Sequence, residues 1–343
     1  MKVAVVILNL NGENFLKKYL PYVLSNNTSY SEIIVADNAS TDNSVSFLKK
    51  EYPEIQIVQN SSNDGFAKGY NDALKLINAE YYILLNSDVE VTKDWIEPVI
   101  KLMDRDKSIA ACQPKIKSLN SRNEFEYAGA AGGFLDKYGY PFCRGRIFDT
   151  VEEDAGQYND TREVFWATGA CMFVRSEYFH LVNGFDNDFF AHMEEIDLCW
   201  RFKNKGYKIM YCGESTVYHL GGGTLNKTSP KKTYLNFRNN LILIYKNHPS
   251  QHFIIKLFFR MILDGIAGLK FLFTGTFTHF FALLKAHKAF YSSLKTTIHK
   301  RTELKKQTTS YTTSAVYKRS ILADYFIRGK KTFKEIDSNN GFS

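Results

Sequence analysis

The amino-acid sequence predicts an α/β protein in which a mostly parallel, Rossmann-like sheet carries helices on both faces and a helical C-terminal region follows. Three observations predict this class. The first hundred residues alternate short β-branched apolar runs with stretches of helical period. Short polar motifs follow several of the apolar runs. After about residue 225 the chain becomes basic and aromatic, with helical periodicity.

The first hundred residues or so supply strands and helices in alternation. Strands are expected over residues 3–10, 32–36, 55–59, 81–85 and 109–113, and helices over 13–24, 44–50, 67–77 and 93–104, the last capped by Thr92. Alternating strands and helices pair into a parallel sheet that the helices cover. Ligands of such sheets bind beyond the carboxyl ends of the strands, so polar residues that follow strands are the candidates for function.

The second part of the chain is less regular. We expect an irregular insertion over residues 114–162, then a strand, a helix and a strand over 170–174, 194–204 and 208–212. A helix is expected over 234–245, followed by a region rich in Phe, Leu and Lys over 253–299. The predicted organisation is a body over residues 1–225, a basic aromatic helical region over 226–300 and a polar basic tail over 301–343.

Composition limits the classes of protein. The chain has 343 residues, 44% of them hydrophobic, which supports a large core and excludes wholesale disorder. Its five cysteines lack C-x-x-C spacing, which argues against a zinc ribbon or a disulfide scaffold and favours a reducing cytosol. We expect no signal peptide, because a strand-like run begins at Val3. The longest charge-free stretch of the aromatic region, residues 271–284, is shorter than the roughly 18 residues of a membrane span.

The net charge of +8 conceals two oppositely charged parts. From Thr224 onward there are 21 Lys and Arg against 5 Asp and Glu, a net charge of +16, whereas residues 1–223 carry −8. This asymmetry predicts an acidic body and a basic region that faces a polyanion or a membrane.

Two polar motifs directly follow predicted strands. Asn86, Ser87 and Asp88 come after a buried apolar run, and a carboxylate there can hold a divalent cation that in turn holds a diphosphate. An ordinary turn would use the same residue types. The motif over 37–42 offers Asp37 to a base or a ribose hydroxyl, while Asp42 or Thr41 could instead cap the next helix.

A third motif lies at the start of a helix, where Gly65 and Gly69 would let a ligand approach backbone N–H groups and Lys68 could face a phosphate. The chain has neither a G-x-G-x-x-G nor a P-loop motif, which removes the main support for a dehydrogenase or a P-loop enzyme. His219, followed by three glycines, is a candidate for a metal or phosphate contact.

Three acids cluster in the segment over 189–201. Glu194 and Asp197 share a helical face, with Glu195 beside them. Partial burial next to other acids raises a carboxyl pKa, as a general base requires. The alternative is an acidic helix N-terminus favoured by the helix dipole.

In this order and spacing the motifs resemble those of family 2 glycosyltransferases of the glycosyltransferase A fold, most closely rhamnosyltransferase-like members of bacterial polysaccharide pathways. The resemblance rests on residues 8–12, 37–42, 63–69, 84–89, 168–175, 184–201 and 217–219 and covers about residues 1–225.

The resemblance implies a role for each matching residue. Asp37 would face the base, Asp88 would be the last acid of the D-x-D metal motif, whose first position here is Asn86, and Glu195 would be the catalytic base where the family usually has Asp. Glu194 and Asp197 remain alternatives for the base. The full set comprises catalytic Glu195, Glu194 and Asp197; nucleotide-binding Asn9, Asn11, Asp37, Asn38, Ser40, Asn63, Gly65, Phe66, Lys68, Gly69, Asn86 and Ser87; metal ligands Asp88 and His219; and acceptor-binding Thr168, Gly169, Trp200 and Arg201.

The implied reaction moves a rhamnose-like or other hexose from a UDP- or dTDP-sugar to a hydroxyl of a glycan or lipid-linked acceptor, with Mg²⁺ or Mn²⁺ as cofactor. One base and no enzyme nucleophile predict a single displacement with inversion, unlike hydrolases that use two carboxylates. The competing classes are a nucleotidyltransferase, whose Gly- and Arg-rich loop is missing after the first strand, and a non-enzymatic polyanion- or lipid-binding protein.

The basic aromatic region predicts peripheral association with an anionic membrane surface, and the resemblance places it on the inner face of the cell membrane in the cytoplasm. The alternative is a helical subdomain packed on the body or on a second subunit, so an oligomer stays open. Nucleic acid is not an expected partner.

Overall fold

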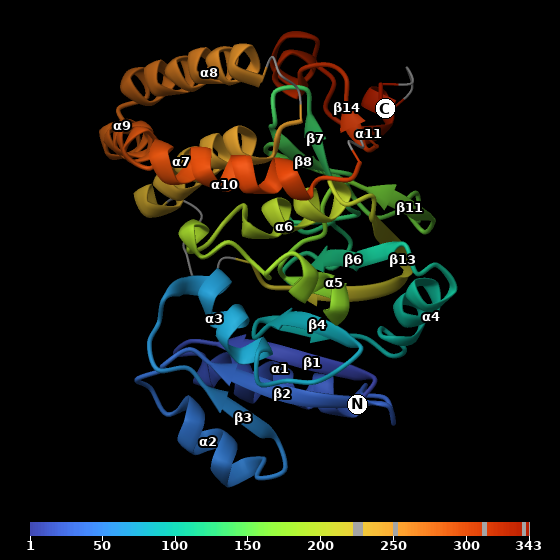
Figure 1. Ribbon diagram of the computed structural model, residues 1–343. Helices are drawn as coiled ribbons and strands as arrows, with labels where there is room; N and C mark the ends of the chain where they lie inside the picture. Colours follow the sequence, from blue (N-terminus) through green and yellow to red (C-terminus); the bar gives the residue numbers. More distant parts are fainter. Residues whose placement is uncertain (222–228, 250–252, 311–313, 338–340, 343) are drawn as a thin grey trace.

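The computed structural model describes residues 1–221, 229–249, 253–310, 314–337 and 341–342. Figure 1 shows a sheet-containing body at one end, with the N-terminus and β1–β3, and a helical region with the C-terminus at the other. The predicted boundary between residues 225 and 226 lies outside the described residues, and the one between 300 and 301 falls inside a helix, α10 (Leu294–Gln307).

The main sheet has nine strands in the order β11-β13-β6-β12-β4-β1-β2-β3, with β5 paired to β13. The strands are β1 (Val3–Asn9), β2 (Ser31–Asp37), β3 (Gln56–Gln59), β4 (Tyr81–Asn86), β5 (Val89–Val91), β6 (Ile109–Ser118), β11 (Thr161–Val164), β12 (Cys171–Arg175) and β13 (Lys208–His219). Strands β3, β2, β1 and β4 run parallel, whereas β12 is antiparallel to both β4 and β6, so the sheet as a whole is mixed.

Helices cover both faces of this sheet, as expected. They are α1 (Glu13–Ser25), α2 (Ser44–Glu51), α3 (Gly65–Leu74), α4 (Glu97–Arg105), α5 (Ser176–Leu181), the 3₁₀ turn η1 (Asn187–Phe189) and α6 (Glu194–Lys203). Alternating residues of β1 divide between two cores. Val3 and Val5 pack with residues of α1 and α4, and Ala4 and Val6 pack with residues of α3 and α6.

The expected helix over residues 93–104 is shorter than predicted, because α4 begins only at Glu97. The short strand β5 lies just before it and pairs with the end of β13. The hydroxyl of Thr92 donates to the carbonyl of Thr216 at 2.7 Å and so does not cap the helix. Asp94 has a left-handed φ of 58°, which a right-handed helix does not accommodate, so the first turn of the expected helix does not form.

The expectation of an irregular insertion over residues 114–162 is wrong. Strand β6 continues to Ser118, and four short strands of the remainder, β7 to β10, join β14 of the C-terminal tail in a second, five-stranded sheet of order β10-β9-β8-β7-β14. Its strands are β7 (Gly133–Asp136), β8 (Pro141–Cys143), β9 (Arg146–Ile147), β10 (Thr150–Val151) and β14 (Val316–Tyr317). Strands of two to four residues are too short to show an alternating pattern in the sequence.

The C-terminal part is mostly helical, and its first helix contacts α6 of the body and the turn between β7 and β8 of the second sheet. It comprises α7 (Pro230–Asn247), α8 (Phe253–Phe273), α9 (Phe277–Ser292), α10, the π turn η2 (Ala323–Ile327) and α11 (Phe333–Asp337). Within the tail that the sequence marks as polar, Tyr317 and Phe333 are both 1% exposed and join the main core. Across the described residues, no helix is both long and apolar enough to cross a membrane.

Candidate functional site

The parallel register brings the ends of three strands to one level. Asn9 lies opposite Asp37, and Leu8 lies opposite Asn86. The Asn9 amide donates to Asp37 Oδ2 at 3.0 Å and to Ser40 Oγ at 3.2 Å, and the Ser40 amide donates to Asp37 Oδ1 at 2.9 Å. The structure thus assembles three of the sequence-predicted nucleotide residues in one buried polar cluster.

Asn11 ties the loops after β1 and β2 together. It has a left-handed φ of 49°, its amide donates to Ser40 Oγ at 2.8 Å, and its Oδ1 accepts from the Thr41 amide at 2.7 Å. Asn9 Oδ1 is buried without a hydrogen-bond partner among the described residues, and a Cβ at Gly12 would lie 2.3 Å from it. At this edge the backbone of the loop after β1 therefore lies so close to the Asn9 side chain that glycine is required at position 12.

A second cluster joins the loop after β2 to helix α3. Asn38 Nδ2 donates to Asn63 Oδ1 at 3.1 Å and to the Gly65 carbonyl at 3.2 Å. Asn60, which begins the polar segment after β3 but has no predicted role of its own, donates to Asn38 Oδ1 and to the Gly69 carbonyl, both at 3.0 Å. The structure thus brings Asn38 of the motif over 37–42 together with Asn63, Gly65 and Gly69 of the motif over 63–69.

Phe66 and Lys68 have different surroundings. Phe66 packs edge-on against Tyr70 and Phe185, with ring centroids 4.8 and 5.9 Å apart. Lys68 forms ion pairs with Asp64 at 2.9 Å and Asp72 at 2.8 Å on the surface of α3. The lysine charge expected to face a phosphate is therefore matched by two local carboxylates.

Asp88 and His219 meet beside β5. The pairing of β13 with β5 sets His219 opposite Val89, and His219 Nε2 lies 3.2 Å from Asp88 Oδ1. Glu126 completes the arrangement, with Oε1 3.5 Å from His219 Nδ1. Burial lowers the pKa of His219, but its hydrogen bonds to Asp88 and Glu126 outweigh this effect and raise it to about 10.

The sequence analysis misses Glu126, because no motif surrounds it and its partner lies on a distant strand. Its amide donates to the Ile116 carbonyl at 3.0 Å, and a Cβ at Gly221 would lie 2.7 Å from its Oε1. Gly221, two residues after His219, therefore lies directly against the Glu126 carboxylate. The other two glycines of that motif lie outside the described residues.

The three acids of α6 have contrasting environments. Asp197 is fully buried and ion-paired with Arg201 at 2.8 Å and Lys246 at 2.6 Å. The Oε2 atoms of Glu194 and Glu195 are buried without a hydrogen-bond partner among the described residues. Burial raises the pKa of Glu195 to about 7, and burial together with the charges of Glu195 and Asp197 raises the pKa of Glu194 well above its usual range.

The backbone just before these acids is strained. Phe190, His192 and Met193 have left-handed φ values of 62°, 68° and 72°. Such conformations of non-glycine residues cost on the order of 1–3 kcal/mol each and cluster at functional sites. The strain supports a functional role for the segment that leads into Glu194 and Glu195.

The residues predicted to bind the acceptor do not form one surface. Thr168 is buried, with its amide donating to Gln113 Oε1 at 2.9 Å, and a Cβ at Gly169 would lie 3.1 Å from the Phe66 ring. Trp200 packs edge-on against Phe165, and Arg201 donates to Asp197. Trp200 is 6% exposed and Arg201 5% exposed, so both serve mainly as core residues.

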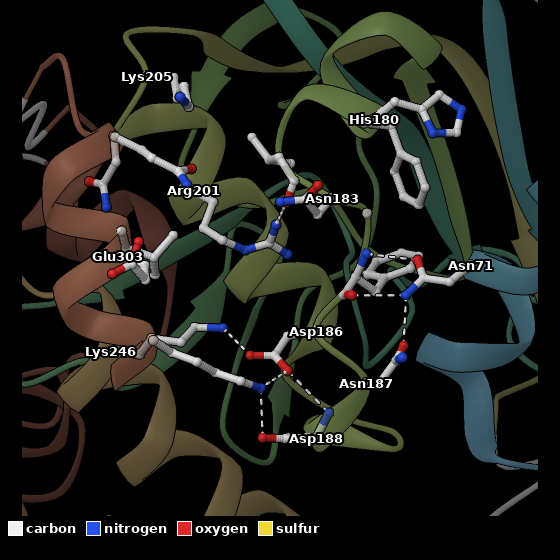
Figure 2. A pocket seen from close by; sticks show the side chains of 18 of the residues that line it. Asn71, His180, Asn183, Asp186, Asn187, Asp188, Arg201, Lys205, Lys246 and Glu303 are labelled. Carbon is white, nitrogen blue, oxygen red and sulfur yellow. Dashed lines mark hydrogen bonds and ion pairs between the residues drawn. The ribbon is translucent and has the colours of Figure 1, made fainter. Parts of the chain in front are cut away.

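A cavity of about 720 Å³ lies between the segment 182–188, α6 and α10. Among the predicted site residues only Arg201 lines it. Figure 2 shows Lys246 reaching Asp186 from α7, at 2.5 Å; Lys300 of α10 contacts the same carboxylate at 2.5 Å and Asp188 at 2.6 Å. Because its basic groups are largely ion-paired, this cavity is a weaker candidate than the sheet edge.

The chain matches the model of the family described as glycosyl transferase family 2 over residues 4–182. It is 23% identical over 230 residues to the N-acetylglucosaminyl-diphospho-decaprenol L-rhamnosyltransferase of Mycobacterium tuberculosis, a match covering 63% of this chain and 75% of that protein. It is 28% identical over 224 residues to the rhamnosyltransferase WbbL of Escherichia coli, with 61% and 80% covered.

Solved structures resemble the fold at lower identity. Staphylococcus aureus TarS 1–349 in complex with UDP-GlcNAc superposes with a TM-score of 0.51 and 17% identity, over 90% of this chain and 91% of that one. GalNAc-T7 with UDP, GalNAc and Mn²⁺ gives 0.56 and 15%, over 72% of this chain but 48% of its own. These likenesses concern the fold alone.

We expect Asp197→Ala to lower the free energy of unfolding by about 3–5 kcal/mol, because it leaves the buried Arg201 without its carboxylate and Lys246 with Asp186 alone. Urea denaturation measures the change. Asp188→Ala is the control, since Asp188 is half exposed and its ion pair should contribute only about 0–1 kcal/mol. Equal stability losses in the two variants would contradict the assignment of Asp197 as a structural anchor.

Proposed function

Because the chain belongs to glycosyl transferase family 2 and is therefore a glycosyltransferase, we propose that it transfers a hexose with inversion from a UDP- or dTDP-sugar to a glycan or lipid-linked acceptor in cell-surface polysaccharide synthesis. The sequence-based predictions of family, fold and enzyme class are confirmed. The observation that carries the proposal is the meeting of Asp88 and His219 at the sheet edge where β1 and β2 end in Asn9 and Asp37.

The donor fits this edge by its chemistry. Asp37, Asn38 and Asn63 offer acceptors and donors to a base and a ribose, at the carboxyl ends of parallel strands. TarS is solved with UDP-GlcNAc and GalNAc-T7 with UDP, which supports a nucleoside diphosphate here. The rhamnosyltransferase relatives support a rhamnose-like sugar, and the mycobacterial one a lipid-linked acceptor.

Asp88 and His219 fit a divalent cation by their donor atoms, a carboxylate oxygen and an imidazole nitrogen 3.2 Å apart. On binding the cation, His219 would lose the proton that its raised pKa keeps on the ring at neutral pH. Among the described residues no three His, Cys, Asp or Glu side chains form a metal cluster, so donor phosphates and water would supply the remaining ligands. When bound, Mg²⁺ or Mn²⁺ neutralises the departing diphosphate. Glu126 would orient the His219 ring from the other side.

Glu195 is the proposed base. Its raised pKa suits it to accept a proton from the acceptor hydroxyl near neutral pH. Glu194 remains the alternative, whereas the ion pairs of Asp197 leave that acid the least available. With one base and no enzyme nucleophile, the hydroxyl displaces the diphosphate in one step and inverts the anomeric carbon. Family membership sets aside the nucleotidyltransferase and the non-enzymatic binding protein.

We propose that the enzyme acts at the cytoplasmic face of the membrane, because α8 and α9 carry an exposed apolar surface. On α8 it comprises Ile254, Ile255, Phe258, Phe259, Ile262, Ile266, Leu269 and Phe273, and on α9 Phe277, Phe281 and Leu284, each at least 45% exposed. Exposed Lys270, Lys285 and Lys288 lie on the same helices. Both helices lie on the outside of the helical region, remote from β1–β3 (Figure 1). An apolar stripe with lysines suits the interface of an anionic bilayer.

The function is tested with a panel of UDP- and dTDP-sugars plus Mg²⁺ or Mn²⁺, by measuring release of nucleotide diphosphate. We expect release from at least one donor, abolished by EDTA and by Asp88→Ala. Asp106→Ala is the matched control, since Asp106 pairs with Lys208 at the opposite end of β13 from His219. Full turnover by Asp88→Ala would refute the cation site, and no release from any donor would refute the proposed donors.

For the base, we expect Glu195→Gln to lower kcat by about 10²–10⁴-fold with donor KM little changed. In the wild type, kcat should rise with pH through about 7 as Glu195 loses its proton, and this limb should vanish in the variant. The protonated Glu195 carboxyl stabilises the fold fully at pH values below its pKa in the unfolded chain, and this contribution is lost as the pH rises through 7. At pH 8 Glu195→Gln should therefore be no less stable than the wild type. A large loss in Glu194→Gln instead would move the role to Glu194.

For the membrane, we expect the protein to sediment with phosphatidylglycerol-containing vesicles at low salt. High salt should weaken the association without abolishing it, because each Lys or Arg contributes roughly 1 kcal/mol that salt screens while inserted apolar side chains are unaffected. Phe258→Glu with Ile262→Glu should release it, and Leu76→Glu, an exposed leucine of the body, should not. Protein that stays in the supernatant at low salt would favour a helical subdomain that does not meet a bilayer.

A further inference from the structure

The strained segment before the catalytic acids is held from outside the body by helix α7. Its residues 188–192 form no regular element beyond the short turn η1, so their carbonyl groups need partners elsewhere. Each of these five carbonyls accepts a hydrogen bond from another part of the chain. Four of the five carbonyls accept from two adjacent side chains of α7, Arg238 and Asn239.

Asn239 provides most of this support. It is fully buried, and its single Nδ2 group lies 2.9 Å from the carbonyls of both Phe189 and Ala191 and 2.7 Å from that of His192. The neighbouring Arg238 donates to the carbonyl of Asp188. The two hydrogens of one amide thus serve three carbonyls, one hydrogen being shared, in a segment that has left-handed φ values on either side of Ala191.

The orientation of the Asn239 amide is fixed by a second contact. Its Oδ1 accepts from Arg238 Nε at 2.9 Å, so its NH₂ group must face the segment. An amide turned the other way would place an oxygen against three carbonyl oxygens.

The remaining carbonyl links the segment to the proposed nucleotide site. Phe190 accepts from the amides of Phe66 at 2.7 Å and Ala67 at 3.3 Å, at the N-terminus of α3. Gly65 leaves room for this contact, since a Cβ there would lie 2.5 Å from the Phe190 carbonyl. The segment therefore joins α3 on the donor side, α6 with its acids, and α7.

We infer that Asn239 is a positioning residue, which holds residues 189–192 in the strained conformation that presents Glu194 and Glu195 to the substrates. The helical region is then part of the catalytic apparatus as well as a proposed membrane contact. The inference rests on the proposed roles of these two acids. Figure 2 shows the ion pairs of Asp186 and Asp188, which anchor the start of the segment.

The matched control is the next residue of the same helix. Asn240 is 1% exposed, and its Nδ2 donates at 2.8 Å to the carbonyl of Gly139, in the turn between β7 and β8. Asn239→Ala and Asn240→Ala therefore remove the same buried amide from the same helix. The first removes the hydrogen bonds to residues 189–192, and the second removes the one to Gly139. Asn239→Ser, which keeps one donor, serves as the milder variant if alanine impairs folding.

The first measurement is hydrogen–deuterium exchange of the folded proteins, which needs no substrate. In Asn239→Ala we expect faster exchange in peptides covering residues 186–195 and 65–70, where the amides of Phe66 and Ala67 depend on Phe190. Asn240→Ala should leave these peptides unchanged and loosen residues 136–140. Unchanged exchange over 186–195 in both Asn239 variants would overturn the inference, whether or not the enzyme turns over any donor.

The second measurement separates positioning from general support of the fold. We expect Asn239→Ala to lower kcat by about 10²-fold, as for a misplacement of about 1 Å, with donor KM little changed, and Asn239→Ser to fall between it and the wild type. Asn240→Ala should keep the wild-type kcat. A loosened segment with kcat equal to that of Asn240→Ala would overturn the positioning role. Wild-type protein inactive on every donor would count against the proposed function, and exchange would still decide whether Asn239 holds the segment.

Discussion

The register of three parallel strands is the constraint on which the candidate site depends. Because β1 pairs with β2 on one side and β4 on the other, Asn9 ends opposite Asp37, and Asn86 ends one residue earlier, opposite Leu8. A slip of one residue in either pairing would turn a strand's polar end to the other face of the sheet. The antiparallel pairing of β13 with β5 adds His219 at the same edge, beside Asp88. Residues from widely separated parts of the chain thus meet through backbone pairing.

The second organising feature is the contrast among the acids of α6. Asp197 faces Arg201 and Lys246 and joins α6 to α7 through buried charges. Glu194 and Glu195 have carboxylate oxygens buried without such partners, so the same helical turn carries one structural acid and two acids with raised pKa values. Their different environments separate their roles, as expected where a base works beside structural ion pairs.

Much of the site is predictable from the sequence, because its residues lie in short motifs directly after apolar strands. This is why Asn9, Asp37 and Asp88 could be selected without a structure. Glu126 and Asn239 could not, since their partners are a histidine on a distant strand and the backbone carbonyls of another loop. A sequence pattern shows periodicity and local motifs, and it carries no signal for contacts of this kind.

The same limit explains the misjudged elements. Strand β5 and the strands of the second sheet are too short for an alternating pattern. β5 pairs with the distant β13 and β7 with the distant β14, while β7 to β10 pair with their neighbours in the chain. The glycine-rich motif offers Lys68 to a phosphate, whereas in the helix Asp64 and Asp72, four residues before and after it, take its charge in ion pairs. Tyr317 and Phe333 are apolar residues in a segment dominated by charges, yet they close the core of the second sheet.

The central claim is that one sheet edge binds both the cation and the nucleotide. A crystal structure with UDP and Mn²⁺, in which anomalous scattering locates the manganese, tests it most directly. The account predicts a manganese peak coordinated by Asp88 and His219, with the uracil ring beside Asp37 and Asn38. Manganese and UDP bound instead in the cavity next to Asp186 and Lys300, with Asp88 and His219 left in contact with each other, would contradict it.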